Sequence, residues 1–282
     1  MAGAVAIEGH VCWPYRLLTG VFKVMLDKYQ SRLSIETQTP VRIVIYSPEA
    51  QPEYPYMVST ERGIIRAKHV FHCTNAFASH LLPQIRGKIF PHRLAMSTMQ
   101  RGPKFPNEGD KVSWLFYRNR ALDTRTGTYD MGMSWMQQNA VTGKLYFGGG
   151  SQKLEDVVSS DDSKVPEEPE NDLAVALPDH FRDRWTTKAA EVDVSWSGII
   201  GKTPDAMPLV GEIRSSGDCG EWIAAGFNGY GMSLSLSSGE AIARMALQEG
   251  VPEWLPRSFL VSDARMNSMV RMGPEAAVRA LL

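Results

Sequence analysis

One stretch near the C-terminal end constrains the fold more than any other, because it joins an apolar strand to a helix through a glycine-rich turn. Glu221–Gly250 starts with an apolar run, places Gly226, Gly229 and Gly231 in the turn, and continues as an amphipathic segment. Glycine has no Cβ, so it lets the backbone adopt positive φ and approach a ligand closely. The helix that follows directs free N–H groups and a positive dipole end at the turn. The turn is therefore a candidate site for an anionic or electron-rich group, unless its glycines serve packing alone.

A second motif precedes this turn by about twenty residues. Ser195–Gly211 contains a turn signal at Thr203–Asp205 and then a short apolar strand at Pro208–Val210. Together with Ala224–Met232, this block resembles the C-terminal flavin-binding region of the D-amino-acid oxidase-like (DAO) family of FAD-dependent oxidoreductases. In that family, which includes glycine and sarcosine oxidases, a T-x-D-x-x-P-x-x-G segment precedes an A-A-G-[FY]-x-G-x-G-[MFV] turn and a helix.

The resemblance extends towards the N-terminus and covers roughly residues 5–250. Gly9–Leu17 is similar to a helix start of the family, Ile64–Asn75 to one of its strands, and Leu145–Gly150 to a strand that ends in consecutive glycines. The resemblance implies FAD as the cofactor. The residues that it implies for cofactor binding are Gly226, Phe227, Asn228, Gly229, Tyr230, Gly231 and Met232 in the turn, with Thr203 and Asp205 bracing it. The position of the cysteine that bonds FAD covalently in sarcosine oxidases falls at Gly198, which implies a non-covalent flavin.

One motif of the family is missing from the sequence. Family members bind the ADP half of FAD with an N-terminal strand–GxGxxG–helix unit and an acidic residue about twenty residues later. The sequence contains no GxGxxG. We therefore expect a fragment, an alternative-start product or a mis-called gene model of a longer flavoprotein. The expected fold class is α/β with α+β elements: a truncated FAD-binding Rossmann-like domain with an inserted antiparallel-sheet substrate domain.

The order of helical and strand patterns suggests a domain division. We expect residues 1–83 to be part of the FAD-binding domain, 84–197 the substrate domain, 198–252 the C-terminal part of the FAD-binding domain, and 253–282 a tail. The expected helices are Tyr15–Tyr29, Ala76–Pro83 and Asp172–Trp185, the last broken near Pro178, and the acidic segment Leu154–Asp172 is expected to be a solvated loop. The expected strands are Leu33–Thr37, Val41–Tyr46, Tyr56–Ser59, Ile64–Cys73, Ile89–Gln100, Lys111–Tyr117, Gly127–Gln137, Lys144–Phe147 and Glu191–Ile199.

Composition argues against several other function classes. A net charge of −1 leaves no electrostatic footprint for nucleic acid or an anionic membrane. The three cysteines, Cys12, Cys73 and Cys219, are too few and too scattered for a disulfide framework or a CxxC metal site. No apolar run approaches the length of a membrane-spanning helix. We expect a cytoplasmic protein whose partner is a small amine or amino acid, and the oligomeric state stays open.

Catalytic residues are not evident, and no metal site is expected. The sequence has no GxSxG, HExxH or Walker A motif. His69 and His72 are three apart on a predicted strand, a spacing that points them to opposite faces. Six aromatic residues on predicted strands line an apolar substrate pocket or belong to ordinary core: Trp114, Trp135, Trp196, Tyr117, Tyr129 and Tyr146.

The two charged residues that hold the substrate carboxylate in relatives have no counterpart here. Glycine and D-amino-acid oxidases place an arginine three residues before the threonine of T-x-D, and sarcosine oxidases a lysine two residues after the last glycine of the turn. Those positions are Ile200 and Ser233. The resemblance implies oxidation of a substrate C–N bond by hydride transfer to the flavin. The alternatives are a non-catalytic remnant that binds no FAD alone, and an unrelated nucleotide-binding module that uses the turn at 226–231.

Overall fold

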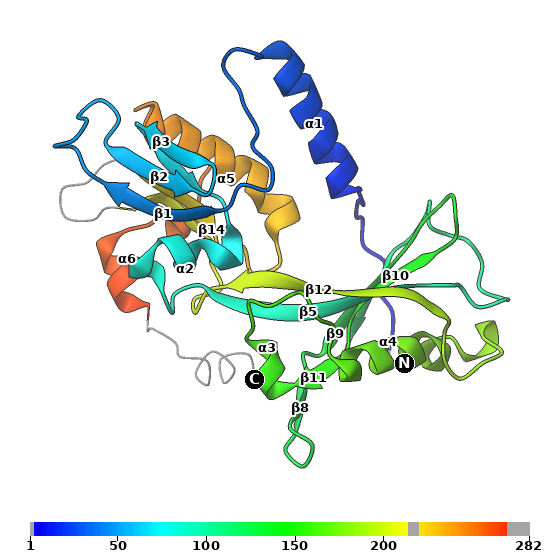
Figure 1. The fold of residues 1–282 in the computed structure, drawn as a ribbon. Helices are drawn as coiled ribbons and strands as arrows, with labels where there is room; N and C mark the ends of the chain where they lie inside the picture. The colour runs from blue at the N-terminus through cyan, green and yellow to red at the C-terminus, as the bar shows by residue number, and fades with distance from the viewer. Residues whose placement is uncertain (1–2, 214–219, 270–282) are drawn as a thin grey trace.

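The computed structural model describes residues 3–213 and 220–269, which form two regions (Figure 1). We call residues 90–202 the sheet region, and residues 14–89 together with 203–269 the turn region. The long antiparallel strands β5 (Phe90–Met99) and β12 (Val192–Lys202) run side by side from the turn region into the sheet region (Figure 1). The two regions therefore meet at the N-terminal end of β5 and the C-terminal end of β12.

The sheet region is built on a five-stranded antiparallel sheet in the order β12-β5-β10-β9-β6. Its other strands are β6 (Trp114–Tyr117), β9 (Met133–Gln138) and β10 (Leu145–Gly149). Helix α4 (Glu167–His180) covers one face, where Leu173 and Leu177 pack against Ala95 and Met99 of β5. A smaller sheet and a short helix extend this region: β7 (Ala121–Asp123), β8 (Thr128–Asp130), β11 (Ser151–Lys153) and α3 (Leu154–Val157).

The turn region has three layers. Its central sheet, in the order β13-β14-β4, consists of β13 (Leu209–Glu212), β14 (Glu221–Ala225) and β4 (Val70–His72), and β14 is parallel to β4. Alternate residues of β14 face opposite layers: Trp222 and Ala224 pack with α5 (Gly231–Ala246), whereas Ile223 and Ala225 pack with α2 (Ala78–Leu81) and with residues near α6 (Asp263–Ser268). Helices on both faces of a partly parallel sheet are typical of α/β folds.

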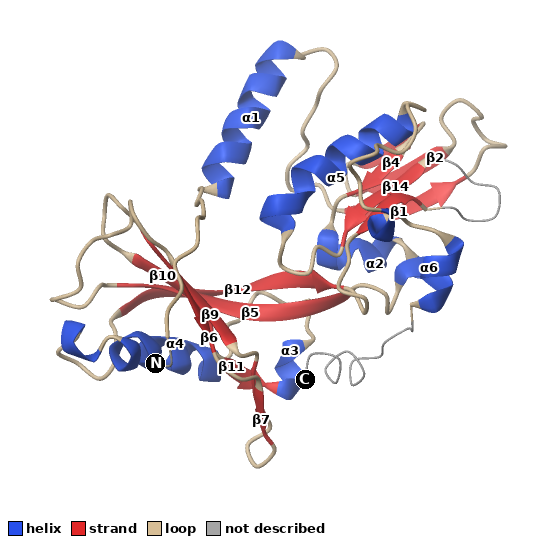
Figure 2. Ribbon diagram, turned by 180° about the vertical axis from the view of Figure 1, so that it is seen from behind, coloured by secondary structure: helices blue, strands red, loops and turns tan. Residues whose placement is uncertain are grey.

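Two further parts of the turn region lie outside these layers. One is an antiparallel sheet of β1 (Val41–Tyr46), β2 (Tyr56–Thr60) and β3 (Gly63–Ala67). The other is α1 (Pro14–Lys28), which stands apart from the three layers and from the sheet region in Figure 2 and contains no buried residue. Its bounds agree with the predicted helix to within one residue. The 3-10 turns of the chain are η1 (Asn75–Phe77), η2 (Pro83–Ile85), η3 (Arg182–Arg184) and η4 (Arg257–Phe259).

The mixed α/β class with an antiparallel sheet is confirmed, but several predicted elements are wrong. Leu33–Thr37 forms no strand. The segment predicted as one strand at Ile64–Cys73 is divided into β3 and β4, because its two halves pair in different sheets. The segment predicted as a helix at Ala76–Pro83 is instead a succession of η1, α2 and η2.

The prediction of a solvated loop at Leu154–Asp172 is also wrong, since the segment contains α3 and the start of α4. Val157 is fully buried, and acidic side chains suit the positive end of a helix dipole. Pro178 does not break α4. A proline cannot donate to the carbonyl four residues earlier, and here that carbonyl, on Ala174, accepts a hydrogen bond from the Ala190 N–H at 2.7 Å.

Candidate functional site

The glycine turn connects the end of β14 to the start of α5. Gly226 and Gly229 have φ of +73° and +98°, a conformation that side chains rarely adopt, whereas Gly231 has no such constraint. A Cβ on Gly226 would lie 2.6 Å from Cγ2 of Thr203, but a Cβ on Gly229 would meet nothing closer than Cδ1 of Ile200 at 3.9 Å. Gly226 therefore allows close packing at the base of the turn, while Gly229 borders open space.

Asn228 and Thr203 hold the turn from one side. Asn228 has φ of +57°, and its side chain accepts a hydrogen bond from the Thr203 N–H at 2.9 Å and donates one to the Gly226 carbonyl at 2.6 Å. Its own N–H donates to the Gly201 carbonyl at 2.8 Å. The Thr203 hydroxyl donates to the Met207 carbonyl at 2.8 Å. These bonds connect Thr203 to the glycine turn on one side and to the Met207 carbonyl on the other.

Asn75 holds the turn from the other side and was not predicted as a site residue. It follows β4, has φ of +47°, and its Oδ1 accepts hydrogen bonds from the N–H groups of Gly226 at 2.9 Å and Phe227 at 3.2 Å. Because β4 and β14 are parallel, the segments that follow them lie at the same end of the sheet. The sequence gives no signal for this role, because the pairing of β4 with β14 is visible only in the folded chain.

Asp205 was predicted to brace the glycine turn together with Thr203, and its strongest contacts are with α6. Its carboxylate pairs with Arg265 of α6, with Nε 2.9 Å from Oδ2, and accepts the Met207 N–H at 3.1 Å. Burial acts to raise the pKa of Asp205, but hydrogen bonds from Arg265 and Met207 outweigh it and leave the pKa below its ordinary value. A hydrogen bond from the Thr203 side chain contributes to this lowering. Its ion pair with Arg265 thus connects the segment after Thr203 to α6.

The start of α5 leaves backbone donors exposed. Tyr230 and Met232 are 67% and 63% exposed, and no side chain caps the helix. Within residues 3–213 and 220–269, the N–H groups of Gly231 and Met232 have no hydrogen-bond acceptor. Phe227, by contrast, is buried against α5. The first three residues of the predicted set therefore form the base of the turn, and the last four form its surface.

The end of β12 places two further groups beside the turn that were not predicted as site residues. The ammonium of Lys202 donates a hydrogen bond to the Asn228 carbonyl at 3.1 Å. Burial, and then the charge of Arg120, lower the pKa of Lys202. His92, opposite Ile200 in the pairing of β5 with β12, is buried, and burial and the Lys202 charge lower its pKa to about 3. No sequence motif marks Lys202 or His92; their places beside the turn follow from the strand pairing and the contacts of the folded chain.

The register of the five-stranded sheet divides the six aromatic candidates. One row of paired residues crosses all five strands on the face opposite to α4: Trp196, Met96, Gly148, Trp135 and Leu115. Tyr146, Tyr117, Ile200 and His92 lie on the same face. Trp114 packs instead against the α4 core, and Tyr129 is buried in β8. Four of the six aromatic residues therefore share the face that reaches the turn through Ile200.

Other candidate groups do not join the site. His72 makes a hydrogen bond to Glu221 at 2.9 Å, and His69 accepts one from Trp222 at 3.4 Å. The described part of the chain contains no group of three or more His, Cys, Asp or Glu that could hold a metal ion. Cys12 and Cys73 are free thiols, and Cys219 lies outside the described residues.

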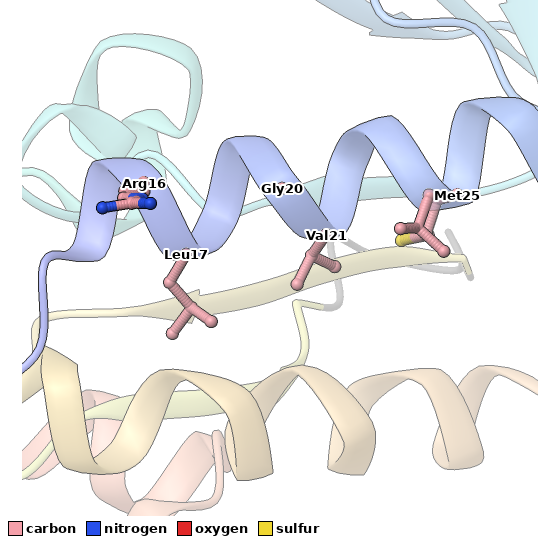
Figure 3. A pocket seen from close by; sticks show the side chains of 6 residues that line it. Arg16, Leu17, Gly20, Val21 and Met25 are labelled. Atoms are coloured by element: carbon pink, nitrogen blue, oxygen red, sulfur yellow. The ribbon is translucent and has the colours of Figure 1, made fainter.

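Two surface hollows lie away from the glycine turn. One, of about 440 Å³, runs along α1, where Leu17, Val21 and Met25 project from the helix in Figure 3. The other, of about 740 Å³, lies among β13, the end of α5 and α6, beside Lys88 and Met266. Residues 226–232 of the turn line neither of these two hollows. Of the helices in the described ranges, none combines the length and the apolar character needed to cross a membrane.

The fold is similar to that of solved amine and amino-acid oxidoreductases. Glycine oxidase from Geobacillus kaustophilus shares 18% identity with a TM-score of 0.55, and the match covers 80% of this chain and 52% of that one. L-Proline dehydrogenase from P. horikoshii shares 20% with a TM-score of 0.59, covering 86% and 57%. Iminodiacetate oxidase from Chelativorans sp. BNC1 shares 14% with a TM-score of 0.59, covering 87% and 57%. The chain thus spans about half the length of these structures.

The sequence itself matches one family model. Comparison with curated proteins finds no match. The model described as FAD dependent oxidoreductase (DAO) matches residues 8–245, which is most of the chain and includes the glycine turn and both long strands. FAD is the cofactor of that family. The chain belongs to the DAO family of FAD-dependent oxidoreductases.

Proposed function

We propose that the glycine turn binds the isoalloxazine ring of a non-covalent FAD and that the protein oxidises a C–N bond of a small amine or amino acid. The observation that carries this proposal is that the N–H groups of Gly231 and Met232, beside the open space at Gly229, have no acceptor among the described residues. A ring edge with carbonyl oxygens and nitrogens suits such donors, and the hydrogen bonds of Asn75 and Asn228 hold them in place.

The residues of the turn fit this group sterically and electrostatically. The positive φ of Gly229 and the absence of a Cβ let a planar ring approach the backbone. The N–H groups at the start of α5 and its dipole stabilise negative charge on the adjoining ring edge. When bound, the flavin supplies the redox chemistry by accepting a hydride from the substrate carbon beside nitrogen.

The sheet region supplies the substrate side in this proposal. Ile200 connects the turn to the sheet face that bears Trp135, Trp196 and Tyr146. Apolar side chains there would exclude water from the reacting atoms and orient the carbon chain of the substrate. We propose the division 84–197 for the substrate domain, with 1–83 and 198–252 as FAD-binding parts and 253–282 as a tail. The names of the similar structures, glycine oxidase, L-proline dehydrogenase and iminodiacetate oxidase, support a small amine or amino-acid substrate.

Titration with lumiflavin, the ring system without ribityl phosphate and ADP, tests the turn by itself. We expect saturable quenching of lumiflavin fluorescence by the parent chain. Gly229→Val should abolish it, since a β-branched residue at this φ adds about 1–3 kcal/mol of strain and fills the open space. Ser233→Ala, one turn along α5, should change the affinity little. Equal lumiflavin binding by Gly229→Val and the parent, with unchanged circular dichroism, would refute a flavin site at the turn.

A second measurement separates the enzyme from the non-catalytic alternative. The chain is saturated with FAD and offered small amino acids with an artificial electron acceptor. Substrate-dependent reduction of the acceptor, lost in Gly229→Val, supports the proposed oxidation. Flavin binding without any such reduction would favour a protein that holds flavin but does not oxidise amines.

A further inference from the structure

Lys202 is a half-buried cation that has no anionic partner among the described residues. It ends β12, and its Nζ lies 3.1 Å from the carbonyl oxygen of Asn228 in the turn. Within the described ranges, no carboxylate lies within ion-pair distance of this ammonium. An ammonium group has three donors, and the Asn228 carbonyl satisfies one. Lys202 therefore has hydrogen-bonding capacity and charge left for a ligand.

His92 adds an unsatisfied polar group at the same place. It is 1% exposed, and neither ring nitrogen has a hydrogen-bond partner in the part of the chain that the structure describes. Most buried side-chain polar atoms in proteins are hydrogen-bonded, so such an orphan calls for an explanation. His92 pairs with Ile200, whose Cδ1 lies 3.9 Å from the Cβ position of Gly229. The orphaned imidazole thus lies on the face that reaches the turn.

The electrostatics of this corner favour an anion. Burial, and then the charge of Arg120 in the connection between β6 and β7, lower the pKa of Lys202. His92 stays neutral near pH 7 because its pKa is about 3, so one of its nitrogens carries a proton to donate. A bound carboxylate would relieve the repulsion between Lys202 and Arg120 and accept hydrogen bonds from Lys202 and His92.

We infer that Lys202 is the residue that binds the substrate carboxylate, with His92 as an accompanying hydrogen-bond donor. The two clamp positions of relatives hold Ile200 and Ser233, and Lys202 supplies the missing charge two residues beyond the first. The carboxylate then lies between the turn and the sheet face, and the carbon chain of the substrate extends towards Trp196. The substrate class is an amino or imino acid rather than a simple amine. This inference rests on the proposed function for the identity of the ligand, but the anion site can be tested without flavin.

The test uses 3-phenylpropionate and its neutral analogue 3-phenylpropionamide, titrated into the 282-residue chain by calorimetry. We expect the acid to bind and the amide to bind at least tenfold more weakly. Lys202→Met should weaken the acid at least tenfold, about 1.4 kcal/mol, while Lys202→Arg keeps it within threefold. Lys188→Met removes an exposed lysine elsewhere and serves as the matched control. Circular dichroism and thermal melting of each variant check the fold.

Each outcome decides the inference separately from the proposed function. Acid binding that needs the charge at position 202 supports it, even if the FAD-loaded chain oxidises no amine. Equal binding of acid and amide, equal binding by Lys202→Met and the parent, or no binding of the acid would overturn it. In those cases the proposed oxidation would stand or fall on the lumiflavin and acceptor measurements alone. Weaker binding by His92→Leu, with Lys202 intact, would add support for the imidazole as donor.

Discussion

Helices of the sheet region and of the turn region differ in how far their apolar faces are buried. In the sheet region, the apolar side of α4 is buried: Leu173 and Leu177 are fully buried in the core that α4 shares with the five-stranded sheet. In the turn region, α1 carries a clearer apolar stripe than α4, yet Leu17 is 55% exposed, and α5 leaves Leu236 85% exposed. An amphipathic pattern thus predicts that a helix has an apolar face, but the contact partner decides whether that face stabilises the fold.

The largest expected effect tests this difference directly. Leu177→Ala should lower the free energy of unfolding by about 2–5 kcal/mol, because it removes a fully buried side chain and leaves a cavity. The same change on α1, Leu17→Ala, should stay within about 0.5 kcal/mol, because the side chain is exposed. Urea titrations of both variants followed by circular dichroism give the two values.

Comparable losses in these two variants would contradict the comparison. They would mean that α1 is covered in solution by a surface that residues 3–213 and 220–269 do not provide. Val21→Ala, on the same stripe of α1, then serves as a check (Figure 3). Its change in unfolding free energy should match that of Leu17→Ala, whether that change is small or large.

Local patterns predicted much of the fold. The helical spacing of apolar residues predicted α1 almost to the residue, and the strand, glycines and amphipathic segment at 221–250 predicted β14, the turn and α5. The errors occur where pairing across the chain decides the outcome. The break between β3 and β4 at Lys68 and His69 depends on two different partner strands, which no local pattern specifies.

The candidate site shows the same limit. The glycines of the turn are visible in the sequence because positive φ requires them. Asn75, Lys202 and His92 are not, since each acts through a residue far away in the sequence or through strand register. Lys202 directly precedes Thr203, the first residue of the T-x-D motif, so it is adjacent to that motif in the sequence. Its role depends on the carbonyl of Asn228, which only the folded chain brings close.

A medium effect is expected at Asn75, which satisfies two N–H groups of buried residues. Asn75→Ala should cost about 1–3 kcal/mol of unfolding free energy because the N–H groups of Gly226 and Phe227 lose their acceptor. Asn75→Asp keeps an acceptor oxygen and should restore most of the loss. Thermal and urea unfolding of the two variants provide the measurement.

The sheet region offers a matched control for this effect. Asn139 accepts two N–H bonds in the same way, from Val141 and Thr142, but in an exposed loop. Water can replace an exposed acceptor, so Asn139→Ala should cost clearly less than Asn75→Ala. If the two alanine variants lose the same unfolding free energy, the N–H groups of the turn are as open to water as those of a surface loop. The predicted difference between Asn75 and Asn139 would then be wrong.

The smallest effect is expected from the ion pair of Asp205 with Arg265. The folded pKa of Asp205 is below its ordinary value of 3.8, so the pair contributes its full stability above about pH 3.8 and loses it as the pH falls through the lower folded pKa. Because the carboxylate is partly exposed, Asp205→Asn should cost less than about 1 kcal/mol at pH 7. The difference between parent and variant should shrink steadily below pH 3.8 in urea titrations at several pH values.

Asp193 provides the counterpart in the sheet region. Hydrogen bonds from Gln100 and Lys144 lower its pKa as well, but it lies at the surface, where water and salt screen the charge. Asp193→Asn should therefore change stability less than Asp205→Asn, and added salt should remove more of its effect. A loss of stability in Asp193→Asn that is larger than in Asp205→Asn, and that added salt does not reduce, would contradict this prediction. It would mean that the ion pair of Asp193 with Lys144 contributes more than that of Asp205 with Arg265.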